Sequence, residues 1–97
     1  MTQHEIIIKS VKIRSIQWDD DYVIYDQLSG NTHLLDGVSG ELICALSEQA
    51  MSRAELLKKL NKLFEDATEL EMEDYLVDFI AKFQSLGLLD IEQREVY

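Results

Sequence analysis

Cationic residues, cysteine and long apolar runs are scarce in this sequence, and proline is absent. Nine Lys and Arg face nineteen Asp and Glu, so the formal net charge is −10. Non-specific nucleic-acid binding needs a positive surface that displaces counterions, and anionic membranes attract polybasic segments. The single cysteine cannot form an internal disulfide, and no stretch approaches the ~20 apolar residues of a membrane span. We therefore expect a cytoplasmic protein with no nucleic-acid or membrane partner.

The apolar content is nevertheless that of a folded protein. Hydrophobic residues make up 46% of the 97 residues, which is too much for a disordered acidic tail. The length fits one small domain, and the chain contains no linker, internal repeat or low-complexity segment. We expect a single domain over residues 1–97, with residues 1–10 and 92–97 loose at its ends.

The first third of the chain has strand chemistry. Residues 11–18 alternate between apolar and polar, but the phase changes near Ser15, which predicts a bulge or break there. Three aspartates at 19–21 form a turn before a β-branched and aromatic strand over residues 22–25. After a turn at Gly30, a short third strand follows at 32–35.

The pattern then takes a helical period. Asp36 is the expected N-cap of a first helix, and Ser52 with Glu55 forms a capping box at the start of a second. After a polar stretch at 65–71, a third helix carries an apolar seam and ends at Gly87. The seam consists of Met72, Leu76, Phe79, Phe83 and Leu86. A short strand at 88–91 closes the domain.

The element order predicts the fold class. A three-stranded antiparallel N-terminal sheet followed by three helices is an α+β arrangement. It is also the outline of a winged helix-turn-helix domain.

Several short motifs from Trp18 onward resemble the PqqD family, especially its branch of peptide chaperones, which are recognition elements for ribosomally made, modified peptides. These motifs are Trp18 with residues 22–26, the stretch SGNTHLLD at 29–36, residues 52–56 and the ending LGLL at 86–89. The resemblance covers the chain after residue 10. Gly37 departs from the branch, which usually has proline directly after the aspartate.

The resemblance implies a non-catalytic domain that captures the leader of a precursor peptide. It also implies that the domain presents this peptide to a modifying enzyme, of which a radical SAM enzyme is one type, in PQQ synthesis or for another peptide-derived product. In such domains the leader adds as a strand beside the third strand and lies against the third helix. The residues that this places at the peptide are Thr32, His33, Leu34, Leu35 and Asp36, together with Glu73, Val77, Ile80 and Gln84 on the third helix.

The residues themselves partly support this mechanism. A short edge strand at 32–35 can accept an added strand. Val77 and Ile80 lie further round the third helix than one core seam requires, so they form either a peptide groove or ordinary core packing. From Glu69 to Phe83 this helix carries five acids and one lysine, which would repel DNA phosphates and argues against a DNA-binding regulator.

Other candidate sites are better explained structurally. A calcium loop starting at Asp19 would need glycine and glutamate at positions where Ile24 and Gly30 stand. Cys44 lies inside the first helix and is expected to be an inert core residue. We expect Trp18, Tyr22 and Tyr25 to close the core of the sheet rather than to form a ligand platform.

No nucleophile motif, phosphate loop or metal-ligand set is present in the sequence, so no enzyme activity and no cofactor are expected. The expected partners are a leader peptide and a modifying enzyme, with the chain a monomer or a homodimer. The alternative is an acidic adaptor or oligomerisation module that binds another folded protein without capturing a linear peptide.

Overall fold

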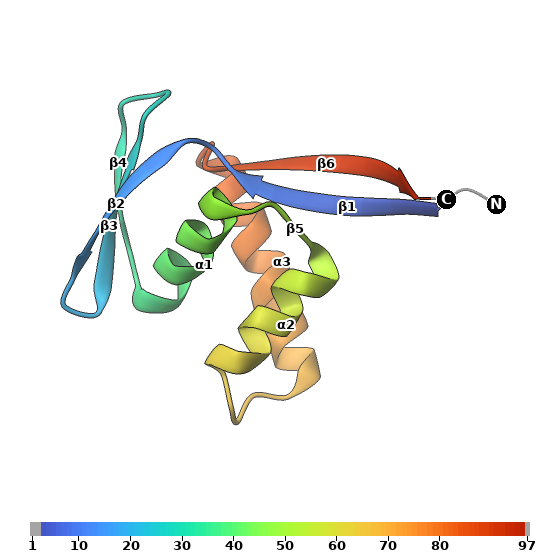
Figure 1. Ribbon diagram of the computed structural model, residues 1–97. Coiled ribbons are helices and arrows are strands. Elements are labelled where there is room, and N and C mark those ends of the chain that lie inside the picture. The colour runs from blue at the N-terminus through green and yellow to red at the C-terminus, as the bar shows by residue number, and fades with distance from the viewer. Residues whose placement is uncertain (1–2, 97) are drawn as a thin grey trace.

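The computed structural model describes residues 3–96 and their side chains from residue 5 to residue 93 (Figure 1). Six strands and three helices follow one another in these residues. Their order is β1 (Gln3–Ser10), β2 (Ile13–Trp18), β3 (Asp21–Asp26), β4 (Thr32–Leu35), α1 (Gly37–Glu48), β5 (Met51–Ser52), α2 (Arg53–Leu63), α3 (Glu69–Ser85) and β6 (Leu89–Val96). The protein is thus an α+β domain of winged-helix-like architecture, with the predicted sheet formed by β2, β3 and β4.

A second sheet joins the two ends of the chain. Strand β1 pairs antiparallel with β6 along all eight residues and with the short β5 on its other side, in the order β5-β1-β6. The expectation of loose ends is therefore wrong for residues 3–10 and 92–96, while residues 1, 2 and 97 lie outside the described residues. The paired residues are between 79 (Ser10↔Leu89) and 93 (Gln3↔Val96) positions apart in the chain, and Ile7, Ile8 and Leu89 are buried there. Local sequence patterns carry no signal of such a distant partner.

Strand β2 runs without the predicted bulge. It pairs with β3 residue by residue from Ile13↔Asp26 to Trp18↔Asp21. The change of phase near Ser15 therefore moves the apolar side chains to the other face of a regular strand. Trp18 is 69% exposed and Tyr25 is 42% exposed, so the expectation that these two rings close the core is also wrong. Only Tyr22, which is half-buried, packs against the core.

Local capping chemistry sets where the helices begin. The Asp36 carboxylate accepts a hydrogen bond from the backbone N–H of Ser39 at 2.8 Å and caps α1, and Ser52 with Glu55 forms the predicted capping box of α2. A second capping box, of Thr68 and Glu71, starts α3 within the stretch predicted to be a polar connection. Gly87, with φ 78°, ends α3 as expected.

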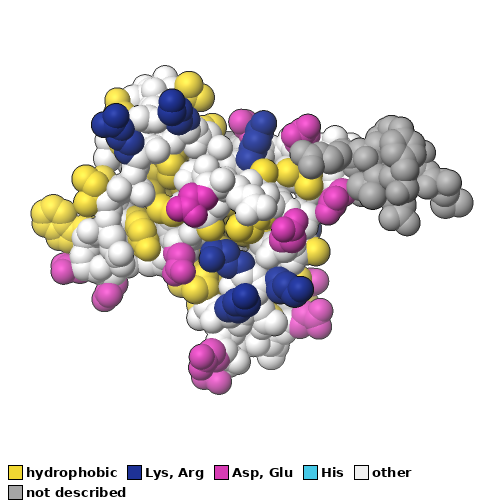
Figure 2. Space-filling view, viewed as in Figure 1, with side chains coloured by type: hydrophobic (Ala, Val, Ile, Leu, Met, Phe, Trp, Pro, Cys, Tyr) yellow, Lys and Arg dark blue, Asp and Glu magenta, His cyan; other side chains and the backbone are white. Residues whose placement is uncertain are grey.

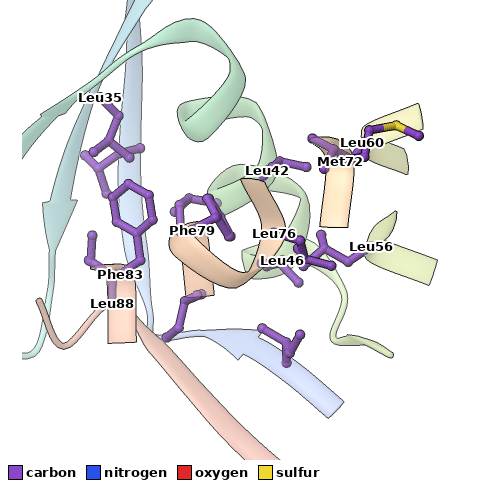
Figure 3. Close-up of a cluster of buried hydrophobic side chains, with 14 residues drawn as sticks. Leu35, Leu42, Leu46, Leu56, Leu60, Met72, Leu76, Phe79, Phe83 and Leu88 are labelled. Carbon is purple, nitrogen blue, oxygen red and sulfur yellow. The ribbon is translucent and has the colours of Figure 1, made fainter. Parts of the chain in front are cut away.

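One buried apolar cluster connects both sheets to the three helices (Figure 3). The predicted seam of α3 contributes four of its five residues, whereas Leu86 is 42% exposed, because it lies past the last helical turn. The fully buried side chains of the cluster include Ile8, Ile24, Leu42, Ile43, Leu46, Leu56, Leu60, Leu76, Phe83 and Leu88. None of the helices in the described residues combines the length and the apolarity of a membrane span.

Two glycines allow α1 to lie close to the β2–β3–β4 sheet. A Cβ at Gly40 would come within 2.2 Å of the Tyr22 ring, and a Cβ at Gly37 would lie 2.6 Å from the carbonyl oxygen of Asp20. Proline also carries a Cβ, so the proline that the resemblance led us to expect at this position would meet the β2–β3 turn. Glycine in place of proline at position 37 is thus explained by the close approach of the β2–β3 turn to the start of α1.

Candidate functional site

A small open cavity lies where the end of β4 and the start of α1 meet α3. Its volume is about 240 Å³. Phe79 and Phe83, both buried, supply its apolar part. The remaining lining residues are Asp36 and Ser39 from the start of α1, and Tyr75, Asp78 and Lys82 from α3. The cavity therefore combines an aromatic base with two carboxylates and one ammonium group.

The outer edge of β4 leads directly to this cavity. In the order β2-β3-β4, the strand pairs with β3 on one side, and no strand of residues 3–96 pairs with its other side. The next residue after Leu35, the last of β4, is Asp36 on the cavity wall. An extended segment that pairs with β4 would thus run toward the cavity.

The hydrogen-bond alternation identifies which backbone groups point outward. The backbone N–H of Asp26 donates to the carbonyl of Asn31 at 2.8 Å, so these two form a hydrogen-bonded pair. In an antiparallel ladder such pairs alternate with non-hydrogen-bonded pairs. His33 and Leu35 therefore direct their backbone groups to β3, whereas Thr32 and Leu34 direct theirs outward. Two N–H and two carbonyl groups are available to an added strand.

Tyr75 on α3 contacts Ser39 on α1, so it connects the two helices that line the cavity. Its hydroxyl lies 3.1 Å from the hydroxyl of Ser39, and its ring packs edge-on against Phe64 with centroids 5.4 Å apart. Burial, together with the nearby charge of Asp36, raises the pKa of Tyr75 above its ordinary value of 10.0, although the hydrogen bond to Ser39 acts in the opposite direction. The phenol is therefore neutral at physiological pH and can donate or accept a hydrogen bond.

The charged groups make the cavity wall mainly acidic. The Lys82 ammonium lies 5.4 Å from the centre of the Phe83 ring, within the range of a cation–π contact. Asp36 holds the N-cap of α1, and Asp78 is exposed on α3. With two carboxylates against one ammonium, the wall favours a cationic group on a bound ligand.

The structure brings only part of the predicted site to this cavity. Among the predicted β4 residues, Asp36 lines the cavity, the backbones of Thr32 and Leu34 form the open edge, and the side chains of His33 and Leu35 face inward. The Nε2 atom of His33 is buried and has no hydrogen-bond partner among the described residues.

The four predicted residues of α3 lie elsewhere. At about 100° per residue, Glu73, Val77, Ile80 and Gln84 point to the side of α3 opposite Tyr75, Asp78 and Lys82. Ile80 is half-buried and packs against the core, whereas Val77 is 55% exposed. None of the four lines the cavity.

The opposite face of α3 holds the residues that sequence reasoning missed. Tyr75 was not recognised as a candidate, and Asp78 and Lys82 were counted only as charges. A signal existed in the sequence, because Tyr75, Phe79 and Lys82 follow helical spacing. That spacing alone does not tell which side of the helix faces β4.

The calcium-loop segment that begins at Asp19, the carboxylate of Asp26 and the thiol of Cys44 do not line the cavity. Asp26 lies at the opposite end of β3 from the 19–21 turn, and its carboxylate accepts hydrogen bonds from the backbone N–H groups of Leu28 and Ser29 at 2.9 and 3.3 Å. These bonds lower the pKa of Asp26. Among the described side chains, which run from residue 5 to residue 93, no group of three or more His, Cys, Asp or Glu is arranged to hold a metal ion. Cys44 is a free, half-buried thiol on α1.

Comparisons with known proteins define the fold. No protein-family model and no curated protein matches the sequence. Among solved structures, the chain is similar to TbiB1 in complex with the TbiA(beta) leader peptide, with a TM-score of 0.70 and 22% sequence identity. The match covers 84% of this chain and 94% of that chain. The two proteins share a fold, as the resemblance implied, and nothing in the match is specific to the PqqD family.

Proposed function

We propose that this chain is a non-catalytic domain that binds the leader of a ribosomally made precursor peptide and presents it to a modifying enzyme. The observation that carries the proposal is the open edge of β4 ending at the cavity between α1 and α3. The shared fold with TbiB1, whose structure contains a leader peptide, supports it. The site binds only the leader of the precursor. The final product, PQQ or another peptide-derived compound, is therefore set by the rest of the precursor peptide.

Strand addition supplies the sequence-independent part of the binding. The outward N–H and carbonyl groups of Thr32 and Leu34 pair with the peptide backbone, as main-chain bonds do in other strand-addition complexes. Successive peptide side chains then point to alternate faces of the sheet. Those on the helix side face the cavity.

The cavity supplies the selective part. Phe79 and Phe83 accept an apolar side chain of the leader, while Asp36 and Asp78 favour a basic residue next to it. The acidic wall also predicts that binding weakens with salt, because exposed charges are screened.

A titration of the isotope-labelled chain with a synthetic leader peptide, taken from the precursor encoded beside its gene, tests the proposal by NMR. We expect shifts in residues 32–36 and in Tyr75, Asp78 and Lys82. Shifts confined to Glu73, Val77, Ile80 and Gln84 would instead favour the α3 face expected from the sequence. No shift with the peptide, but shifts with a purified modifying enzyme, would favour the adaptor alternative.

A proline substitution separates strand addition from side-chain recognition. Thr32→Pro removes an outward N–H and leaves the ladder to β3 intact, because Thr32 is in a non-hydrogen-bonded pair. Peptide affinity should fall by up to about tenfold, the effect of one hydrogen bond. Thr32→Ala keeps the N–H and should bind like wild type. Equal affinities of the two variants would contradict strand addition at β4.

A further inference from the structure

The outer face of the β2–β3–β4 sheet carries an aligned apolar row. The ladder places Ile16 opposite Val23 and Val23 opposite Leu34, so one residue from each strand forms a line across the sheet. Ile16 is 65% exposed and Leu34 is 70% exposed. Trp18 and Tyr25 point to the same face, by the alternation of side chains along a strand. We call these five residues the outer row.

Core packing does not account for the outer row. Sheets with one solvated face usually place apolar residues inward and polar ones outward. Strand β2 does the reverse beyond Ile13, because Ser15 and Gln17 point to the inner face and Ile16 and Trp18 point to solvent. Singly scattered apolar residues are normal at a surface, but a contiguous group marks an interaction site.

The charges around the outer row identify the kind of partner. Exposed aspartates at 19–21 follow Trp18 directly, and the whole chain has a net charge of −10. Figure 2 shows hydrophobic side chains over the sheet at the left of the view, with acidic side chains just below them. A second copy would bring another charge of −10, which opposes pairing of like chains. A folded protein whose apolar patch carries Lys or Arg opposite these aspartates fits both features, and Arg14, opposite Tyr25, lies at the other end of the row.

The outer row is also continuous with the open edge of β4. Leu34 is its last member and lies on that edge. A peptide strand added to β4 therefore places alternate side chains beside Leu34, on the same face. This step, together with the identification of the partner as the enzyme that processes the peptide, rests on the proposed function.

We infer that the outer row is a docking surface for a folded partner whose apolar patch is bordered by basic residues. This partner is the enzyme that processes the captured peptide. Bound peptide extends the docking surface. The domain would then present both its own face and the outward side chains of the peptide. Trp18 and Tyr25 are of the residue types that dominate protein–protein binding. The partner should accordingly bind the peptide-loaded domain more tightly than the free one.

The test measures the affinity of the full chain for each purified enzyme encoded beside its gene, with and without the synthetic leader peptide. Ile16→Ser and Trp18→Ser should each weaken enzyme binding at least tenfold and leave peptide binding unchanged. Leu70→Ser is the matched control, because Leu70 on α3 is 68% exposed and lies outside the outer row. It should leave both affinities unchanged.

Three results would overturn the inference. They are an absence of enzyme binding by the wild-type chain, equal effects of Ile16→Ser and Leu70→Ser, and a wild-type dimer in sedimentation that Ile16→Ser dissociates. Failure of the proposed function is distinguishable, because it shows as an absence of peptide binding in the separate titration. If enzyme binding depends on Ile16 but is the same with and without peptide, the outer row is a docking face. The proposal that bound peptide extends this face would then be wrong.

Discussion

The hydroxyl of Tyr75 on α3 lies 3.1 Å from the hydroxyl of Ser39 on α1, and both residues line the candidate peptide cavity. Ser39 is buried and its backbone N–H is held by Asp36, the N-cap of α1. The contact thus fixes α3 relative to the residue that follows β4. A peptide on β4 would meet a cavity wall whose position is already set.

Replacing Tyr75 with Phe should loosen this junction. The variant loses one hydrogen bond and leaves the Ser39 hydroxyl without its partner, so we expect a loss of about 0.5–1.5 kcal/mol in the free energy of unfolding. Urea denaturation measures the change. Tyr25→Phe, on the exposed sheet face, is the control and should be neutral. Equal stabilities of the two variants would show that the Tyr75–Ser39 contact contributes nothing.

Gly40→Ala should destabilise the fold although it replaces glycine in a helix. Such a change normally favours a helix by up to about 1 kcal/mol. Here the added Cβ would come within 2.2 Å of the Tyr22 ring, and we expect a net cost of about 1–3 kcal/mol. Thermal or urea unfolding of a double-mutant cycle with Tyr22→Ala checks the cause. A cost that persists unchanged without the Tyr22 ring would contradict this explanation.

The sequence left open whether Val77 and Ile80 form a peptide groove or pack in the core. Ile80→Asp and Val77→Asp distinguish these two interpretations. Ile80 packs against the core, so a carboxylate there should cost about 1–3 kcal/mol of stability. Val77 is exposed, and its replacement should change stability by no more than about 0.5 kcal/mol. Denaturation curves give both values. A stable Ile80→Asp variant with weakened peptide binding would instead assign the groove to this face.

Acid should remove the stabilisation that Asp26 provides. Two backbone N–H groups stabilise the carboxylate and lower its pKa in the folded state. A lowered pKa contributes stability above the unfolded value of 3.8, and this contribution is lost as the pH falls through the folded value. The stability difference between wild type and Asp26→Asn should therefore be constant from neutral pH to about 5 and shrink below about 4. A difference that stays constant down to the lowest pH at which both proteins fold would contradict it.

Much of the fold could be predicted because its signals are local. Asp36 and Ser52 cap their helices as expected, Gly87 ends α3, and the α3 seam is buried except for Leu86. Each of these features depends on residues a few positions apart. Capping, turn formation and helical periodicity act at that range.

The candidate site was predicted only on its β4 side. The edge strand at 32–35 and Asp36 could be located from the sequence, because a short strand next to a helix cap is a local pattern. On α3 the sequence points to the face of Val77, whereas the cavity is lined from the face of Tyr75, and peptide binding by the Val77 face stays a prediction. Both faces of the helix adjoin the apolar seam, so the sequence has no means of choosing between them.

The sequence by itself determined the class of strands and helices, their caps and turns, and the acidic charge that argues against nucleic-acid binding. Only the tertiary structure decided that β1 pairs with β6, that Trp18 faces solvent, and that Tyr75 faces Ser39. These three results depend on contacts between segments distant in the chain. Burial and pairing across such distances are settled by packing the whole domain, because each element can bury its apolar side chains only against the others.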